Sequence, residues 1–436
     1  MAFYLRGVNL PHRKHTNAEV SEAMPAPKSV ILPMSMHIGK AAVPTVKVGD
    51  EVCVGTLVAE QDGFISSRVY SSVSGKVTKI ADMLASGGHK VTTIVIESDG
   101  NMTPDPTISA PVIDSREAFV EAVKASGVVG LGGAGFPTYV KFNVDPEKID
   151  ELIVNGAECE PYITSDSHTM INKSEDMALA IDTVIKYYGL KKVIIGVERN
   201  KKKAIESMKK LASRDSRIEV RVLPEVYPQG GEKVLVYHTT GKKIPLGKLP
   251  ADVGCIVCNC TTLAAIGNYI KRGMPLTKKC VTVDGGAVKE PKNVIVPIGT
   301  PISEVFEFCG GLVCEPKKVL YGGPMMGISV PSLDAPVLKN TNALLALVEK
   351  ETETPKPTSC IKCGSCVNTC PFGINPAEIA RAYEKGDLES AARIGVELCM
   401  ECGCCSFVCP AVRPLVQINK LTKAALREAK AKEEKR

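Results

Sequence analysis

One cysteine pattern, present twice near the C-terminus, constrains this chain more than any other feature. The pattern is C-x2-C-x2-C-x3-C-P, and its two copies are Cys360, Cys363, Cys366, Cys370 and Pro371, then Cys399, Cys402, Cys405, Cys409 and Pro410. Three closely spaced thiolates can hold three corners of one iron–sulfur cluster, and the fourth cysteine of each copy ligates the other cluster. The sequence therefore predicts two [4Fe-4S] clusters and transfer of one electron at a time.

The predicted ligand sets are crossed between the copies. Cluster 1 takes Cys360, Cys363, Cys366 and Cys409, and cluster 2 takes Cys399, Cys402, Cys405 and Cys370. Structural zinc usually uses paired C-x2-C knuckles, which disfavours a zinc site. Disulfide scaffolds belong to short secreted chains, whereas this one has 436 residues, and its first 25 carry charged residues without an apolar core. We expect a reducing, cytosolic compartment.

Nine further cysteines lie outside the eight predicted ligands. Cys255, Cys258 and Cys260 are close enough to suggest a metal site, but no fourth ligand is evident. Buried free thiols are the expected state, because cysteine is among the most buried residues. Cys404, beside Cys405, is a spare cysteine within the second copy.

Charge and hydropathy exclude some classes of function. The longest candidate for a membrane span, Ala343 to Val348, is far shorter than the roughly 18 to 20 apolar residues that a span needs. A formal charge of +6 is small for this length and does not indicate a nucleic-acid partner. The tail from Lys420 to Arg436 predicts a charged helix, which is either solvated or in contact with a partner or an anionic membrane surface.

The first part of the chain, about residues 28–100, is rich in short alternating apolar runs with Gly and Asp between them, which predicts small antiparallel sheets. The pattern resembles the barrel-sandwich hybrid of lipoyl and biotinyl carrier domains. Those carriers bear their cofactor on a hairpin lysine, but no lysine lies between Glu60 and Tyr70. A structural or docking barrel is therefore expected rather than a swinging arm.

From Ser115 onward the pattern becomes α/β, and a glycine-rich loop follows the first helix. Glycines at 130, 132, 133 and 135 let the backbone approach an anion closely, and Lys141 can supply a positive charge. A short buried strand then ends at Asn155, at the edge where α/β sheets bind ligands. No buried strand leads into the loop and Pro137 follows it, so a dinucleotide site of the Rossmann type is not predicted.

Together these segments resemble the flavin-binding core of the 51 kDa NADH-binding subunit of respiratory complex I. The resemblance implies FMN contacts at Gly132, Gly133, Gly135, Lys141, Asn155, Glu158, Gly230, Gly231, Asn259 and Thr262, and NADH contacts at Phe136, Glu160 and Glu232. Two positions depart from the family pattern. Ala157 stands where the family has Asp, and Gly231 stands where it has the first Glu of a Gly-Glu-Glu turn.

The order of the parts resembles the C subunit of the Rnf complex, an ion-translocating ferredoxin:NAD⁺ oxidoreductase. The resemblance implies an α/β multidomain fold. Its expected parts are an N-terminal segment and barrel-sandwich hybrid (1–110), an α/β FMN/NADH-binding domain (111–270), a β-grasp, SLBB-like module (271–330), a linker (331–358) and an α-helical, ferredoxin-like double-[4Fe-4S] domain with a basic C-terminal helix (359–436).

The same resemblance implies a peripheral subunit on the cytoplasmic face of the membrane, without a transmembrane helix of its own. Its partners would be iron–sulfur and integral membrane subunits, and no nucleic acid. A nicotinamide exchanges two electrons and a cluster passes one, so FMN would stand between NAD(H) and the two clusters. Two alternatives stay open: a soluble NADH-dependent reductase such as a cobalamin reductase, and a flavin-free electron relay.

Overall fold

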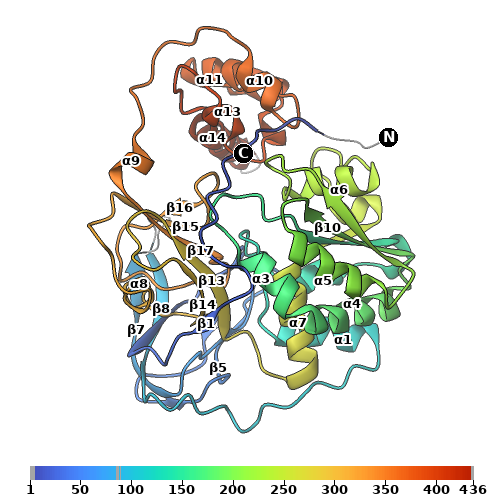
Figure 1. The fold of residues 1–436 in the computed structure, drawn as a ribbon, viewed down its shortest axis with the longest axis vertical. Helices are drawn as coiled ribbons and strands as arrows, with labels where there is room; N and C mark the ends of the chain where they lie inside the picture. The colour runs from blue at the N-terminus through green and yellow to red at the C-terminus, as the bar shows by residue number, and fades with distance from the viewer. Residues whose placement is uncertain (1–4, 85–87, 89, 434–436) are drawn as a thin grey trace.

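The computed structural model describes residues 5–84, 88 and 90–433. Figure 1 shows three regions: a β-rich part at the lower left, an α/β part at the right and a small helical part at the top. Their strands form four sheets among the described residues. The small helical part contains both cysteine motifs.

The N-terminal barrel is built from two small antiparallel sheets. One has the order β2-β8-β7-β4 and the other β3-β5-β6. Their strands are β2 (Ser29–Pro33), β3 (Val43–Pro44), β4 (Glu51–Val52), β5 (Leu57–Glu60), β6 (Val69–Tyr70), β7 (Gly75–Leu84) and β8 (Lys90–Ser98). Alternate side chains such as Val30, Leu32, Ile94 and Ile96 are fully buried, as expected of strands with one face toward a core.

The α/β part has a four-stranded parallel sheet in the order β11-β10-β9-β12. Its strands are β9 (Glu151–Gly156), β10 (Lys192–Glu198), β11 (Ile218–Leu223) and β12 (Cys255–Asn259). Its helices are α1 (Arg116–Ala125), α2 (Thr138–Phe142), α3 (Ser165–Asn172), α4 (Ser174–Tyr188), α5 (Lys202–Ala212), α6 (Glu232–Thr240) and α7 (Cys260–Arg272). The chain leaves β9 toward β10 and returns on its other side at β12. The strand order therefore reverses beside β9, and ligands bind at such reversals.

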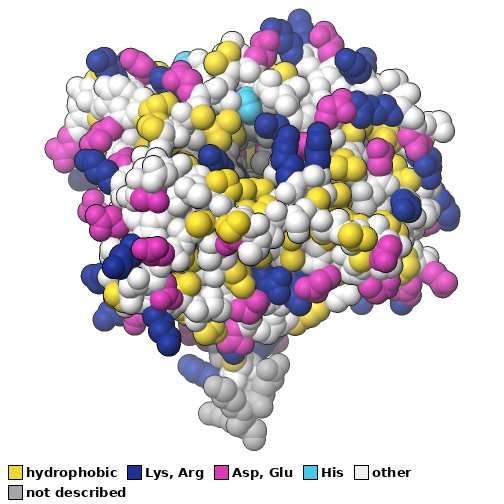
Figure 2. Space-filling model, turned by 90° about the horizontal axis from the view of Figure 1, so that it is seen from below, with side chains coloured by type: hydrophobic (Ala, Val, Ile, Leu, Met, Phe, Trp, Pro, Cys, Tyr) yellow, Lys and Arg dark blue, Asp and Glu magenta, His cyan; other side chains and the backbone are white. Residues whose placement is uncertain are grey.

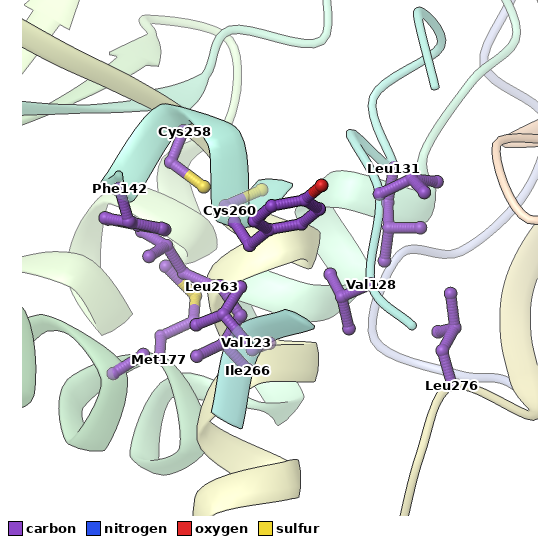
Figure 3. Packing of buried hydrophobic residues seen from close by; sticks show 14 of the residues in the cluster. Val123, Val128, Leu131, Phe142, Met177, Cys258, Cys260, Leu263, Ile266 and Leu276 are labelled. Carbon is purple, nitrogen blue, oxygen red and sulfur yellow. The ribbon is translucent and has the colours of Figure 1, made fainter. Parts of the chain in front are cut away.

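A buried cluster joins these helices to the sheet. Figure 3 shows Phe142, Cys258, Cys260 and Leu263 from α2, β12 and α7 gathered around one apolar interior. Gly267 lets α7 approach α4 closely, because a Cβ there would overlap the carbonyl oxygen of Asp176. The close packing holds α7 against α4, and the residue before α7, Asn259, lies beside Gly132 of the glycine-rich loop.

The third sheet has six strands in the order β1-β14-β13-β17-β15-β16. They are β1 (Glu22–Ala23), β13 (Lys278–Asp284), β14 (Lys292–Pro297), β15 (Lys318–Tyr321), β16 (Ile328–Ser329) and β17 (Ala343–Leu347), with α8 (Ile302–Phe308) nearby. The sheet thus extends beyond the expected 271–330 module at both ends. The interval 331–358, expected to be a linker, contributes β17, whose five residues are all buried because they lie between β13 and β15.

The helical part follows α9 (Glu349–Thr352) and an extended segment. Its helices are α10 (Ser365–Thr369), α11 (Pro376–Glu384), α12 (Leu388–Ile394), α13 (Cys404–Phe407) and α14 (Leu415–Glu433). Helices α11 and α12 lie between the two cysteine motifs, and the charged helix predicted for the tail is present as part of α14 as far as residue 433. The N-terminal segment contacts this part through Thr369 Oγ1, which donates to Gly7 O (3.0 Å), and its next residue, Val8, pairs with Tyr227 of the α/β part.

The surface is mixed in charge. Figure 2 shows Lys and Arg side chains interspersed with Asp and Glu over one face, without a field of a single sign. Within the described part of the chain, no helix combines the length and the apolar character needed to cross a bilayer.

Candidate functional site

The glycine-rich loop is closed by its own backbone and anchored on α7. Gly130 N donates to Phe136 O (2.8 Å), and Leu131 N donates to Thr262 Oγ1 (2.9 Å). A Cβ at Gly132 would lie 2.9 Å from Asn259 Nδ2, so a side chain there would clash. Gly133 and Gly135 have φ of +133° and +68°, which favour glycine. The loop is therefore a cradle of bare backbone beside the start of α7.

Asn259 and Thr262 contact the glycine-rich loop from the start of α7. Asn259 is the N-cap of α7: its Oδ1 accepts from the backbone of Thr261 (2.9 Å) and Thr262 (3.2 Å). Its Nδ2 donates to Asp166 Oδ2 (2.7 Å). Asn259 thus caps α7 and Thr262 anchors the loop, and both residues lie beside the glycine-rich loop.

Asn155 connects the end of β9 to the turn before α6. Its Nδ2 donates to Gly230 O (2.9 Å), and its Oδ1 accepts from Ala157 N (3.2 Å). The side-chain amide of Asn155 therefore holds the end of β9 and the turn at Gly230 together, and both segments carry residues predicted to contact FMN. A Cβ added at Gly231 would overlap the Cε of Met400, so the turn also packs against the second cysteine motif.

Lys141 is the cation of the site. Its Nζ lies 2.7 Å from Glu232 Oε1 and donates to Val257 O (3.0 Å). The side chains of Lys141 and Glu232 are 28% and 40% exposed, so solvent reaches both. An anionic ligand at the loop can share this ammonium group with Glu232, which suits a phosphate-bearing cofactor.

Glu158 contacts the start of α3. Its carboxylate accepts from Asp166 N (2.6 Å) and Ser167 Oγ (2.5 Å) at the start of α3. Burial is the largest cause that raises the pKa of this carboxyl group. Among the ten residues that the resemblance assigns to FMN, Asn259 caps α7 and Glu158 accepts hydrogen bonds at the start of α3.

Glu160 faces a loop of the six-stranded sheet. Its carboxylate accepts from Met325 N (3.0 Å) and Met326 N (2.8 Å), and burial raises its pKa to about 7. Of the other two residues assigned to NADH, Glu232 is paired with Lys141, and Phe136 is half-buried within the loop.

The raised pKa of Glu160 predicts a pH dependence of stability. Its pKa is higher in the folded chain (about 7) than in the unfolded chain (about 4.5), so the folded state binds the proton more tightly. This contribution is present at pH 5 and is lost as the pH rises through about 7. We expect the melting temperature of the neutral variant Glu160→Gln, measured relative to the wild type, to rise by roughly 2–4 °C from pH 5 to pH 8. A constant difference across thermal melts at these pH values would contradict the expectation.

The structure adds a residue that sequence reasoning missed. Lys14 Nζ donates to Glu158 O (3.3 Å) and Glu160 O (3.2 Å), and burial lowers its pKa. It lines a cavity at the carboxyl ends of β9, β10 and β11, together with His12, Glu198 and Tyr227 among others. No local pattern marks Lys14, because its partners lie more than 140 residues away.

The four cysteines assigned to cluster 2 come together. Cys370, Cys399, Cys402 and Cys405 all line one cavity in the helical part, which the spare Cys404 lines as well. Three of these cysteines belong to the second motif and one to the first, so the predicted ligands of cluster 2 from both motifs line the same cavity. Four convergent thiols are the donor set that a [4Fe-4S] cluster needs.

The cysteines assigned to cluster 1 are nearer to the surface. Cys366 and Cys409, from different motifs, pack in one apolar cluster with Ala380. Cys360 is half-buried, and Cys363 is exposed, with its thiol 3.4 Å from Ser365 Oγ. This side of the helical part is therefore its solvent-facing side.

The second cysteine motif touches the flavin-site segments directly. Tyr227 OH donates to Cys402 O (2.8 Å), and Cys404 Sγ lies 3.8 Å from Tyr227 O. The spare Cys404 is thus a buried contact between the two parts. Cys255, Cys258 and Cys260 are buried as expected, and burial raises the pKa of Cys255 and of Cys258 to about 12.

Family models match four segments of the chain. They are the RnfC barrel-sandwich hybrid domain (3–101), the Nuo51 FMN-binding domain (123–268), the SLBB domain (280–329) and the 4Fe-4S dicluster domain (354–410). These matches confirm the expected fold classes, and they confirm FMN and [4Fe-4S] clusters as the cofactors.

One solved structure shows a likeness of fold alone. A chain of an NAD⁺-reducing [NiFe]-hydrogenase in the H₂-reduced state is 19% identical with a TM-score of 0.50, and the match covers 70% of this chain and 61% of that chain.

Curated relatives extend over most of the chain. The C subunit of the Na⁺-translocating ferredoxin:NAD⁺ oxidoreductase complex of Acetobacterium woodii is 42% identical over 87% of this chain and 87% of its own length. The C subunit of the proton-translocating ferredoxin:NAD⁺ oxidoreductase complex of Clostridium ljungdahlii is 41% identical over 87% of this chain and 84% of its own. These relatives confirm the predicted resemblance, and the chain belongs to the family of C subunits of Rnf-type ion-translocating ferredoxin:NAD⁺ oxidoreductase complexes.

Proposed function

We propose that this chain is the NADH- and FMN-binding peripheral subunit of an Rnf-type complex, at the cytoplasmic face of the membrane. It would exchange hydride with NAD(H) and single electrons with iron–sulfur and integral membrane subunits. Its relatives' names support this assignment, since they are subunits of ferredoxin:NAD⁺ oxidoreductase complexes.

FMN is assigned to the cradle of bare glycine backbone beside α7. When bound, it supplies the conversion between two-electron hydride exchange and one-electron transfer. Lys141 would bind its negative charge, and Asn155, Asn259 and Thr262 would hold the surrounding segments in place. Glu232 would lie at the nicotinamide side with Phe136. We assign no general acid or base.

The two cysteine sets are assigned to successive positions in an electron path. Cluster 2 would be next to the flavin, and cluster 1 would face the partner subunits. One observation carries the proposal: the second cysteine motif contacts the Tyr227–Glu232 turn of the flavin site, through Tyr227 OH to Cys402 O at 2.8 Å. The solvent-facing position of Cys363 supports the outer place of cluster 1.

The test is anaerobic purification of the full chain, with iron and flavin quantified and NADH-dependent reduction of ferricyanide measured. Two tetranuclear clusters and one flavin require about eight irons and about one FMN per chain. Eight irons without flavin or NADH oxidation would reduce the protein to an electron relay. Reduction of a corrinoid by NADH would instead assign it to the soluble reductases.

A further inference from the structure

The two cysteine motifs are copies in backbone as well as in sequence. Lys362 and Glu401 occupy the same position in the two copies, and both have positive φ, 55° and 61°. Gly364 and Gly403 repeat in the same way, with φ of 77° and 82°. Helix α11 starts at Pro376 and α14 at Leu415, again at equivalent positions. The environments of the two predicted clusters can therefore be compared residue by residue.

Asn419 of α14 lies against the cluster 2 cysteines. It is fully buried, and its Nδ2 is 3.4 Å from Cys399 Sγ, within the distance of an N–H···S hydrogen bond. It lines the same cavity as the four cysteines of cluster 2. Its Oδ1 has no hydrogen-bond partner among the described residues. Burying an amide whose oxygen has no hydrogen-bond partner costs free energy, which indicates that Asn419 has a role in the cluster 2 site.

One turn further along α14, Lys423 fixes the distance between the helix and Cys399. Its Nζ donates to Cys399 O (2.9 Å) and pairs with Glu401 (2.6 Å). Because Glu401 balances its charge, Lys423 acts mainly as an anchor. Lys423 and Asn419 lie on the same face of α14, so the contacts of Lys423 keep the amide of Asn419 beside the Cys399 sulfur.

The first copy lacks this donor. The residue equivalent to Asn419 is Ala380, which is fully buried in the apolar cluster with Cys366 and Cys409. A methyl group cannot donate a hydrogen bond. The equivalent of Lys423 is Glu384, which pairs with Arg413. The chain thus provides a side-chain N–H to a cluster 2 cysteine and an apolar group at the same place near cluster 1.

We propose that Asn419 raises the reduction potential of cluster 2 above that of cluster 1 by donating a hydrogen bond to the thiolate of Cys399. Reduction adds negative charge to a cluster, and a hydrogen bond to its sulfur stabilises the reduced form more than the oxidised form. The inference rests on the proposed ligand sets. It assigns Asn419 as a positioning residue of the redox chain, and it makes cluster 2, beside the flavin site, the better electron acceptor of the pair.

The experiment is a potentiometric titration of the full, anaerobically purified chain, followed by electron paramagnetic resonance. The wild type should show two one-electron steps. Asn419→Leu keeps the branching of the side chain at Cγ and removes the donor. In this variant the equilibrium constant for the higher reduction step should drop about tenfold, which lowers its potential by about 59 mV. Asn419→Asp keeps the shape, replaces the donor with an acceptor and should lower the same step further. The lower step should stay in place.

Lys420→Met is the matched control, because Lys420 is exposed on the same helix and its removal should move neither step. The proposal is overturned if Asn419→Leu and Asn419→Asp retain eight irons and both steps are unchanged, if both steps fall equally, or if the lower step moves instead. A wild-type chain that holds only one cluster would overturn the ligand assignment itself, which the iron count distinguishes from a failure of the Asn419 proposal alone.

Discussion

The variant Cys370→Ser should lose cluster 2 and keep cluster 1, although Cys370 belongs to the first cysteine motif. The cavity that Cys370 lines is also lined by Cys399, Cys402 and Cys405 of the second motif and by the spare Cys404. Loss of one tetranuclear cluster reduces the iron content from about eight to about four per chain. Because cluster 2 is assigned to the place next to the flavin site, electron transfer from NADH to acceptors beyond it should fall by more than the roughly 10–100-fold typical of outer-shell changes.

The measurement is iron analysis with electron paramagnetic resonance of the reduced protein. Cys370→Ser and Cys402→Ser should lose the same signal, and Cys363→Ser should lose the other. Cys314→Ser is the control, since Cys314 is an exposed cysteine outside both motifs and should leave iron at about eight. If Cys370→Ser and Cys363→Ser lost the same signal, each motif would hold its own cluster and the crossed assignment would be wrong.

The variant Lys141→Ala should lose FMN while both clusters remain. Lys141 Nζ lies 2.7 Å from Glu232, so its removal leaves a half-exposed carboxylate without its cation at the predicted flavin site. A charge-assisted hydrogen bond is worth roughly 1.5–3 kcal/mol, which corresponds to roughly a 10- to 100-fold loss of affinity. Flavin content and NADH:ferricyanide activity should fall together, with iron unchanged.

Lys148→Ala is the matched control for this variant. The side chain of Lys148 is 77% exposed, and its partner is Asp145, outside the predicted flavin site. Flavin fluorescence after denaturation gives the FMN content of both variants, and added FMN should restore activity in Lys141→Ala at high concentration. A Lys141→Ala protein with full flavin and full NADH oxidation would remove Lys141 from the site.

The sequence by itself determined the parts whose chemistry is local. Eight cysteines in two copies of one spacing predict two clusters, because that spacing places the thiols where a cluster needs its ligands. The glycines of the loop predicted a backbone that an anion can approach closely, because glycine has no Cβ, whereas the roles of Asn259 and Thr262 came from the family resemblance. The charged tail likewise predicted a helix, which is part of α14.

Only the tertiary structure decided where side chains point and which distant segments meet. The sequence did not show that the carboxylate of Glu158 accepts a hydrogen bond from Asp166 N at the start of α3. Residues 343–347 were placed in a linker, and pairing with two strands from other segments made them part of a sheet. Lys14 and Met400 reach the site from segments far apart from it in the chain. The contact of Asn419 with Cys399 depends on which face of α14 packs against the cysteine motif. Such contacts depend on the whole core, which no local pattern encodes.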